Sequence, residues 1–162
     1  MTAACARAVA RHLLEVDAFG FDPDHPVRTP SGRATPIAID ARPLVGYPRL
    51  RRRLVATAVD RLAEAAGVEA FDAVAGAEIG GLAMAAWLAD ALALPMLYVR
   101  KKPKGFGRNA AIEGRLKEGA RVLLVDDVAT DGASKLAFVD ALRAAGARVE
   151  HVLVVCAAAI WP

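Results

Sequence analysis

The strongest chemical signal in the sequence is a pair of adjacent carboxylates that directly follows an apolar run. Asp126 and Asp127 come after residues 122–125, which are all valine or leucine, and residues 130–134 then combine hydroxyl groups with small side chains. Two acids at the end of a strand can accept hydrogen bonds from the vicinal hydroxyls of a ribose. Backbone N–H groups at the start of a helix bind phosphate. The segment therefore predicts a site for a ribose phosphate.

Each of these residues also has an ordinary structural explanation. Acids are common on protein surfaces, and Asp131 suits the N-cap of the helix that is expected after it. Singly these explanations are adequate. They do not account for the paired acids, the small-residue loop and the helix start occurring together, so we favour a binding site.

A basic segment follows a second short apolar run, at residues 96–99. It carries five cations before the next acid, Glu113: Arg100, Lys101, Lys102, Lys104 and Arg108. This concentration of positive charge suits a polyanionic ligand. Exposed lysine runs are also typical of solvated faces, and the cluster alone would fit weak nucleic-acid contact. The sequence contains no recognisable nucleic-acid-binding motif that would favour the last explanation.

A third candidate is the glycine-rich turn that contains Ile79, Gly80 and Gly81. It connects an expected strand to an expected helix and would expose backbone N–H groups to a ligand. On these residues alone, a tight turn whose glycines serve packing is an equally good explanation.

Apolar periodicity predicts the elements that position these candidates. Strands are expected at residues 71–75, 96–99, 122–125 and 149–155, and helices at 48–66, 81–92 and 132–145. Strands that alternate with helices form βαβ units, and an uninterrupted apolar run is typical of a central strand. The predicted fold class is α/β, a Rossmann-like domain with a central, mainly parallel sheet flanked by helices. Ligands of such sheets bind at the carboxyl ends of the strands.

The first 47 residues have a different pattern. A helix is expected at residues 7–19 with Gly20 as its stop, followed by turns at 22–33 and a short strand at 37–39. We expect a small N-terminal hood segment here. The chain of 162 residues then forms one domain, with the helix and hood at 1–47 and the core at 48–162.

Composition excludes a membrane protein of the helical kind. The chain is 56% hydrophobic with a formal net charge of +3, yet acids, prolines and glycines interrupt its apolar stretches. None approaches the roughly eighteen residues of a membrane span, and the N-terminus lacks the pattern of a signal peptide. The expectation is a cytoplasmic protein with no membrane and no nucleic acid among its partners.

Residues 122–134 resemble the motif with which type I phosphoribosyltransferases bind phosphoribosyl pyrophosphate (PRPP). That motif consists of an apolar strand, two acids and Thr-x-Gly-x-Thr/Ser. The resemblance implies the fold of that family and places Asp126 and Asp127 at the ribose hydroxyls and, through PRPP or water, at Mg²⁺. It assigns PRPP binding also to the residues that follow: Val128, Ala129, Thr130, Asp131, Gly132, Ala133 and Ser134. Asp131 departs from the pattern as an acid inside an anion-binding loop.

Residues 98–108 are similar to the basic loop of the orotate phosphoribosyltransferases. In that group the loop is mobile, closes over pyrophosphate and reaches the active site of the neighbouring subunit, which implies a homodimer. The resemblance assigns five residues to the pyrophosphate of PRPP: Arg100, Lys101 and Lys104 from the loop, and Ile79 and Gly80 from the glycine-rich turn. The histidine of the group's loop falls on Phe106 here.

The segment at residues 31–36 resembles the Ser-Gly-x-x-Ser-Pro segment of the orotate enzymes. By this resemblance the base lies near four residues: Thr130, Arg33, Ala38 and Ile39. Ala38 and Ile39 replace the aromatic residues that flank the base in the orotate enzymes. The sequence ends before the segment whose arginine holds the orotate carboxylate in that group, so Arg33 is the candidate substitute cation.

Together the resemblances imply an enzyme that joins orotate to the ribose phosphate of PRPP and releases pyrophosphate. Its catalytic residues are predicted to be Lys104, Asp126 and Asp127, and Phe106 predicts weakened catalysis. Two alternatives are a phosphoribosyltransferase for another base and a non-catalytic PRPP-binding regulator, and Phe106 favours the regulator.

Overall fold

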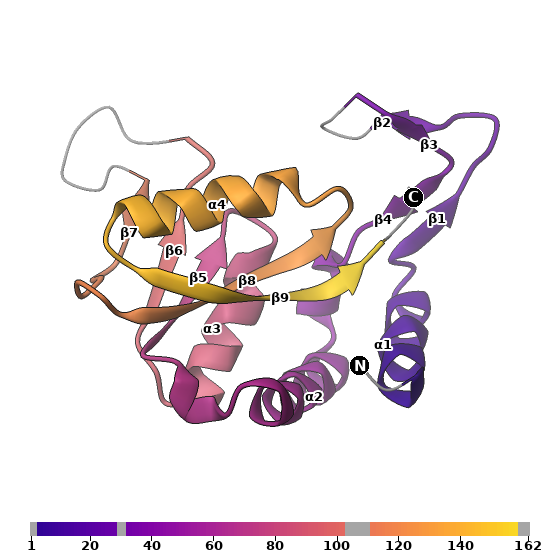
Figure 1. The fold of residues 1–162 in the computed structure, drawn as a ribbon. Helices are drawn as coiled ribbons and strands as arrows, with labels where there is room; N and C mark the ends of the chain where they lie inside the picture. The colour runs from indigo at the N-terminus through magenta and orange to yellow at the C-terminus, as the bar shows by residue number, and fades with distance from the viewer. Residues whose placement is uncertain (1–2, 29–31, 103–110, 159–162) are drawn as a thin grey trace.

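The computed structural model describes residues 3–28, 32–102 and 111–158, and its centre is a five-stranded sheet (Figure 1). The strands lie in the order β7–β6–β5–β8–β9. Their bounds are Ile112–Glu113 for β7, Met96–Val99 for β6, Ala73–Ala77 for β5, Arg121–Ala129 for β8 and Arg148–Ala157 for β9. The pairs β6–β5, β5–β8 and β8–β9 are parallel, whereas the short β7 runs antiparallel to β6. The predicted α/β class with a mainly parallel sheet is confirmed.

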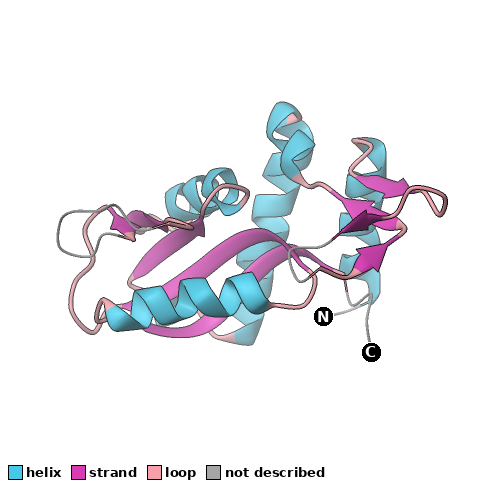
Figure 2. Ribbon diagram, turned by 90° about the horizontal axis from the view of Figure 1, so that it is seen from above, coloured by secondary structure: helices cyan, strands magenta, loops and turns pink. Residues whose placement is uncertain are grey.

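Helices cover both faces of this sheet (Figures 1 and 2). Helices α2 (Pro48–Ala65) and α3 (Gly81–Ala91) share a core with Leu123 and Val125, while α4 (Ala133–Ala144) packs with Leu124 on the other face. Successive residues of a strand point to opposite faces, so a strand buried on both sides must be apolar at every position. This is the reason for the uninterrupted valine and leucine run of β8.

Two strand boundaries differ from the sequence-based expectation. Strand β8 continues past residue 125 to Ala129, so Asp126 and Asp127 are its residues and do not follow it. The extension has a structural cause, because Asp126 pairs with Val154 and Ala129 with Ala157 of the long neighbouring strand β9. Strand β5 begins two residues later than expected, since a short 3-10 helix (Val68–Ala70) precedes it.

The N-terminal helix also ends earlier than expected. Helix α1 spans Ala3–Glu15, and the chain turns at Asp17, whose φ is +52°. The N–H groups of Asp17 and Ala18 donate to carbonyls of the last helical turn, an arrangement that closes a helix. Gly20 was expected to stop the helix, and that expectation is wrong. Gly20 lies instead in a strand, β1 (Phe19–Phe21).

The remaining N-terminal segment forms two small antiparallel pairs. Strand β1 pairs with β4 (Ile37–Ile39), and β2 (Val27–Arg28) pairs with β3 (Ala34–Thr35). We call these four strands the hood. Figure 1 shows the hood beyond the carboxyl ends of β8 and β9, with the β2–β3 pair at its far side. A short 3-10 helix, η1 (Arg42–Gly46), leads from the hood into α2.

No helix in the described ranges combines the length and the apolarity that a bilayer span requires.

Candidate functional site

The two acids of β8 point to opposite faces of the sheet. By strand alternation Asp126 faces the same side as Leu124, which is the side of α4, and Asp127 faces the side of α3. Asp126 is buried, with 5% of its surface exposed, and Asp127 is half-buried. The pair therefore meets two different sets of neighbours.

Asp126 is held by contacts to both of its carboxylate oxygens. The ammonium Nζ of Lys135 lies 2.7 Å from Asp126 Oδ2, and the N–H of Asp127 donates to Asp126 Oδ1 over 2.9 Å. Burial raises the pKa of Asp126, while the hydrogen bonds from Lys135 and Asp127 act in the opposite direction. The buried carboxylate of Asp126 and the ammonium of the half-buried Lys135 therefore compensate each other's charge.

Asp127 lies against the glycine-rich turn that follows β5. A Cβ placed on Gly80 would lie within 2.6 Å of both carboxylate oxygens of Asp127, and a Cβ on Gly81 would lie 2.9 Å from the Cα of Asp126. Real Cβ atoms do not approach so closely, so a side chain at position 81 would collide with the backbone of β8, and one at position 80 would displace the Asp127 carboxylate. The parallel β5–β8 pairing brings this turn to the end of β8. The packing explanation of the glycines is thus correct, and it places their backbone beside the paired acids.

Glu78 connects the glycine-rich turn to the basic segment. Its Oε2 accepts a hydrogen bond from the N–H of Lys101 over 2.7 Å, and its own N–H donates to the carbonyl of Val99 over 2.9 Å. The side chain of Arg100 lies 3.5 Å from Glu113 of β7. The start of the basic segment is therefore fixed beside the turn. Lys104 and Phe106 lie outside the described residues.

The loop between β8 and α4 turns through Gly132, whose φ is +78°. The hydrogen bonds of α4 begin at this residue, because the N–H groups of Lys135 and Leu136 both donate to the Gly132 carbonyl. The N-cap residue of α4 is Gly132, so the expectation that Asp131 is the N-cap is wrong. Asp131 lies one residue earlier, and its carboxylate accepts from the N–H of Ala133, the first residue of the helix, over 3.1 Å.

The four residues predicted for the base come from separate elements. Thr130 is half-buried directly after β8, whereas Arg33 is exposed before β3, in the part of the hood farthest from the sheet (Figure 1). Alternation along β4 directs Ala38 and Ile39 to opposite faces. Ile39 lines an apolar pocket with Leu13 and Phe19. One ligand therefore cannot contact both side chains from the same face of β4.

Two charged residues of this region were not singled out by the sequence. Arg42 makes a bidentate ion pair with Asp40, with both N···O distances at 2.7 Å. Hydrogen bonding to Asp40 raises the pKa of Arg42, and the charge of Asp127 contributes in the same direction. Lys135 is the other residue. Its sequence signal is its position three, four and seven residues before Phe138, Val139 and Leu142, the buried stripe of α4.

The acids at this site suit a magnesium ion that arrives with a phosphate ligand. Mg²⁺ prefers oxygen ligands, keeps several waters, and commonly uses one or two carboxylates together with substrate phosphates. Within the described ranges, no group of three or more His, Cys, Asp or Glu side chains forms a metal cage. Because Lys135 already compensates Asp126, Asp127 is the better placed of the two acids for such an ion.

Comparison with known proteins identifies the family to which this site belongs. Residues 50–160 match the model of the phosphoribosyl transferase domain. The chain belongs to the phosphoribosyl transferase family. The match begins at α2 and includes the glycine-rich turn, the basic segment and the β8–α4 loop, so all three candidate segments lie within it.

Several phosphoribosyl transferases are similar to this chain over most of its length. An orotate phosphoribosyltransferase of Cereibacter sphaeroides is 53% identical over 157 residues, which cover 97% of this chain and 68% of that protein. The orotate phosphoribosyltransferase of Ruegeria sp. is 51% identical over 157 residues, covering 97% of this chain and 70% of that protein. The chain thus spans about two thirds of the length of these relatives.

Solved phosphoribosyl transferase structures share the fold. The orotate phosphoribosyltransferase of Aeropyrum pernix superposes with a TM-score of 0.72 at 30% identity, covering 92% of this chain and 93% of that one. The adenine phosphoribosyltransferase of Saccharomyces cerevisiae reaches a TM-score of 0.70 at 22% identity, covering 93% and 90%. At that identity the adenine enzyme shows the common fold alone.

Proposed function

We propose that this phosphoribosyl transferase joins orotate to PRPP, forming orotidine 5′-phosphate and pyrophosphate for pyrimidine nucleotide synthesis. The observation that carries the proposal is the arrangement at the end of β8. There the paired acids Asp126 and Asp127 lie between the Gly80 turn and the loop at residues 130–134. The relatives that are 51–53% identical and carry the name of the orotate enzyme support this choice of base.

In the proposed complex the strand-end acids accept hydrogen bonds from the ribose hydroxyls. The loop of residues 128–134 supplies backbone N–H groups and hydroxyls to the 5′-phosphate at the start of α4. Glu78 joins the turn of Ile79 and Gly80 to the start of the basic segment, at Arg100 and Lys101. The proposed pyrophosphate ligands are Ile79, Gly80, Arg100 and Lys101.

The reaction requires a base nitrogen to replace pyrophosphate at C1 of the ribose. Positive charge develops on the ribose and negative charge on the departing pyrophosphate, so fixed cations beside pyrophosphate stabilise the transition state. Magnesium, bound with PRPP near Asp127 and Asp126, would supply further positive charge to the phosphates. The residues of the chain hold PRPP in position and balance its charge, and covalent catalysis by a side chain is not needed.

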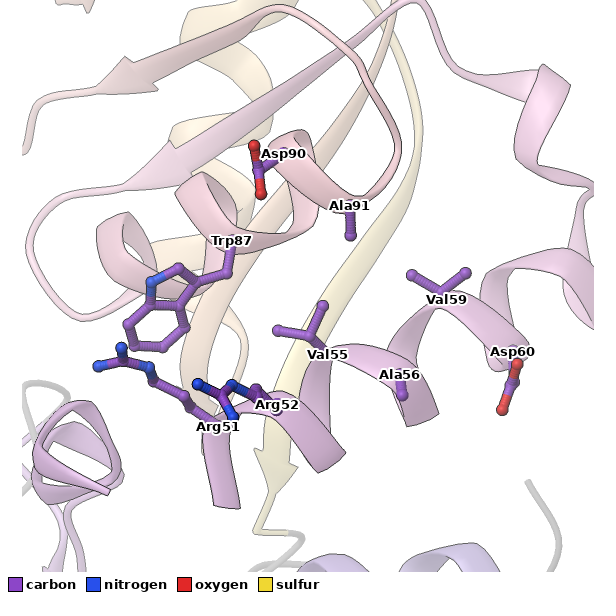
Figure 3. A pocket seen from close by; sticks show the side chains of 9 residues that line it. All are labelled: Arg51, Arg52, Val55, Ala56, Val59, Asp60, Trp87, Asp90 and Ala91. Carbon is purple, nitrogen blue, oxygen red and sulfur yellow. The ribbon is translucent and has the colours of Figure 1, made fainter. Parts of the chain in front are cut away.

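We further propose that the chain acts as a homodimer in which Lys104 serves the site of the neighbouring subunit. The α2–α3 groove is the proposed contact surface between the two copies (Figure 3). Apolar side chains of both helices form its floor, including Val55, Val59 and Trp87. Arg51 lies over the Trp87 ring, 5.0 Å from its centroid.

The charges of this groove are arranged for pairing with a second copy of itself. Arg52 lies near the N-terminal end of α2, and Asp60 lies eight residues later, roughly 12 Å along the helix axis. A two-fold axis across the middle of the groove would set Arg52 of each copy opposite Asp60 of the other. Such self-complementarity is the requirement of an isologous dimer.

A non-catalytic PRPP-binding regulator is the second candidate, and Phe106 is the observation that favours it. A positioned proton donor or acceptor typically contributes about 10²- to 10⁴-fold in rate, and the basic loop has phenylalanine at the position of the orotate group's histidine. Phe106→His should therefore raise turnover with little change in orotate affinity if the chain is an enzyme.

A base panel tests the proposed function directly. The protein would be incubated with PRPP and Mg²⁺ plus orotate, uracil, adenine or hypoxanthine, and pyrophosphate release would be followed. We expect release with orotate and little with the other bases. Pyrophosphate release with a different base and not with orotate would identify that base as the substrate. If the natural protein and Phe106→His both bind PRPP tightly but release no pyrophosphate with any base, the chain is a PRPP-binding regulator and not an enzyme.

A further inference from the structure

Lys135 occupies a position on α4 where the helix otherwise buries apolar side chains. Phe138, Val139 and Leu142 follow at helical spacing on the same stripe and are all buried against the sheet. The side chain of Lys135 is only 14% exposed. Lysine is seldom buried unless its charge is paired, so its place on this stripe requires a specific partner.

That partner is the strand-end acid, and a second contact joins Lys135 to the phosphate-type loop. The ammonium Nζ lies 2.7 Å from Asp126 Oδ2 and 3.2 Å from the hydroxyl Oγ of Ser134. Asp126 Oδ1 accepts at the same time from the N–H of Asp127. The carboxylate is thus fixed at both oxygens, and one cation links the two parts of the ribose phosphate site.

The contact with Ser134 also fixes the direction in which that hydroxyl can donate. An ammonium group has three donors and no acceptor, so in the contact with Lys135 the Ser134 oxygen must accept. The hydroxyl proton of Ser134 then points away from Lys135 and is available to a phosphate oxygen at the start of α4. A neutral side chain at position 135 would leave the hydroxyl without this constraint.

The charge of Lys135 has a second consequence for a polyanionic ligand. Asp126, Asp127 and Asp131 place three acids within six residues of a site that is to receive phosphate. Like charges repel, and the repulsion is strongest where water is excluded. Lys135 is the cation in direct contact with Asp126, and it compensates this acid from within the helix that starts at the loop.

We propose that Lys135 is a positioning residue for the ribose 5-phosphate half of the PRPP site. It holds the Asp126 carboxylate in the orientation that receives the ribose hydroxyls, directs the Ser134 hydroxyl toward the phosphate, and offsets the acidic charge of the loop. The inference rests on the proposed PRPP site and adds a residue to it. By this proposal Lys135 contributes to the affinity for the ribose 5-phosphate half of PRPP, whereas the affinity for pyrophosphate does not depend on Lys135.

Calorimetry on the intact protein with three separate ligands tests this assignment. Wild type, Lys135→Met and Lys117→Met would each be titrated with ribose 5-phosphate, with pyrophosphate and with PRPP plus Mg²⁺. Lys117 is an exposed cation before the N-terminal end of β8, so its variant controls for the loss of one positive charge. We expect Lys135→Met to bind ribose 5-phosphate and PRPP at least about tenfold more weakly, with pyrophosphate affinity within about twofold. Lys117→Met should match wild type for all three ligands.

A double variant separates positioning from general damage to the fold. In the Asp126→Asn background, Lys135→Met should weaken ribose 5-phosphate binding by less than about threefold, because the group that Lys135 positions has already lost its charge. The double variant also removes the uncompensated buried charge, so it remains informative if Lys135→Met alone does not fold. An undiminished effect in the double variant, or equal losses for ribose 5-phosphate and pyrophosphate, would overturn the assignment. Unchanged ribose 5-phosphate affinity in Lys135→Met would also overturn it while leaving the proposed function intact. A wild-type protein that binds none of the three ligands would instead reject the PRPP site itself.

Discussion

Gly80 and Asp127 lie so close together that a side chain at position 80 would displace the Asp127 carboxylate. A Cβ on Gly80 would come within 2.6 Å of both Asp127 carboxylate oxygens. The two residues are 47 positions apart, Gly80 in the turn after β5 and Asp127 in β8, and the β5–β8 pairing brings them side by side. The glycine-rich turn therefore depends on the paired acids for its packing, and the acids depend on it for their orientation.

Gly80→Ala should displace Asp127 and weaken PRPP binding. Overpacking of this kind typically costs about 1–3 kcal/mol, which for a chain of this size lowers Tm by roughly 2–10 °C. The measurements are thermal unfolding and PRPP titration. Gly46→Ala is the matched control, because a Cβ at Gly46 meets no atom within 4 Å. Equal PRPP affinity in Gly80→Ala and wild type would show that the Asp127 carboxylate is not a ligand.

Asp126→Asn and Asp127→Asn should each weaken PRPP binding. A hydrogen bond to a charged group is worth about 1.5–3 kcal/mol, so a loss of roughly 10- to 100-fold in affinity is expected for each variant. Calorimetry would measure the PRPP affinity of each variant. Asp140→Asn is the control for the removal of one acid, because Asp140 is exposed on α4. Unchanged PRPP affinity in the double Asp126→Asn, Asp127→Asn variant would rule out the strand-end acids as PRPP ligands.

Lys104→Ala should lower turnover, and mixing this variant with a second inactive variant should restore activity. Removing one donor to a developing anion costs about 3–4 kcal/mol of transition-state stabilisation, or roughly 10²- to 10³-fold in rate. When Lys104→Ala subunits are mixed with Asp127→Asn subunits, heterodimers contain one site with both residues intact if the loop acts across the interface. Pyrophosphate release should then recover. Verified heterodimers that stay inactive would assign Lys104 to its own subunit.

Reversing one charge of the α2–α3 groove should weaken self-association, and reversing its partner as well should restore it. Arg52→Asp and Asp60→Arg singly place like charges opposite each other in the proposed dimer, whereas the double variant re-forms the pair with exchanged signs. Sedimentation equilibrium would measure the dimer dissociation constant, which we expect to rise at least about tenfold in each single variant. Three variants with the wild-type constant would show that the groove is not the contact surface.

The ion pair between Asp72 and Arg121 should make the stability of the fold depend on pH in the acid range. Three hydrogen bonds from Arg121, at 2.8–3.0 Å, hold the pKa of the Asp72 carboxyl well below its usual range. A depressed folded-state pKa gives stability that is present above the unfolded value, about 3.9, and is lost as pH falls toward the folded value. Asp72→Asn should therefore lower Tm at pH 7 by more than at about pH 2, measured by calorimetry. A Tm difference that stays constant over this range would contradict the role of the pair.

The sequence alone determined the features that are local in the chain. Asp126 and Asp127, the small-residue loop and the start of α4 follow one another within nine residues, so their spacing already indicated a ribose phosphate site. The uninterrupted apolar run of β8 is also a local feature. It indicated a central strand, because a strand that is buried on both faces has apolar residues at consecutive positions. The end of α1 was predicted wrongly, because a non-glycine residue, Asp17, adopts the left-handed turn that sequence rules assign to glycine.

Only the tertiary structure decided how distant residues meet at the site. Whether Lys135 faces solvent or Asp126 depends on the face of the sheet that α4 covers, and the closeness of Gly80 to Asp127 depends on the β5–β8 register. The charge of Asp127 contributes to the raised pKa of Arg42, although the two residues are 85 positions apart in sequence. Helical and strand periodicity record which side of an element is buried, but they do not record which element buries it. The spacing of residues 126–134 therefore predicted the strand-end motif, and the packing of α4 and the glycine-rich turn against β8 decided which groups lie beside each acid.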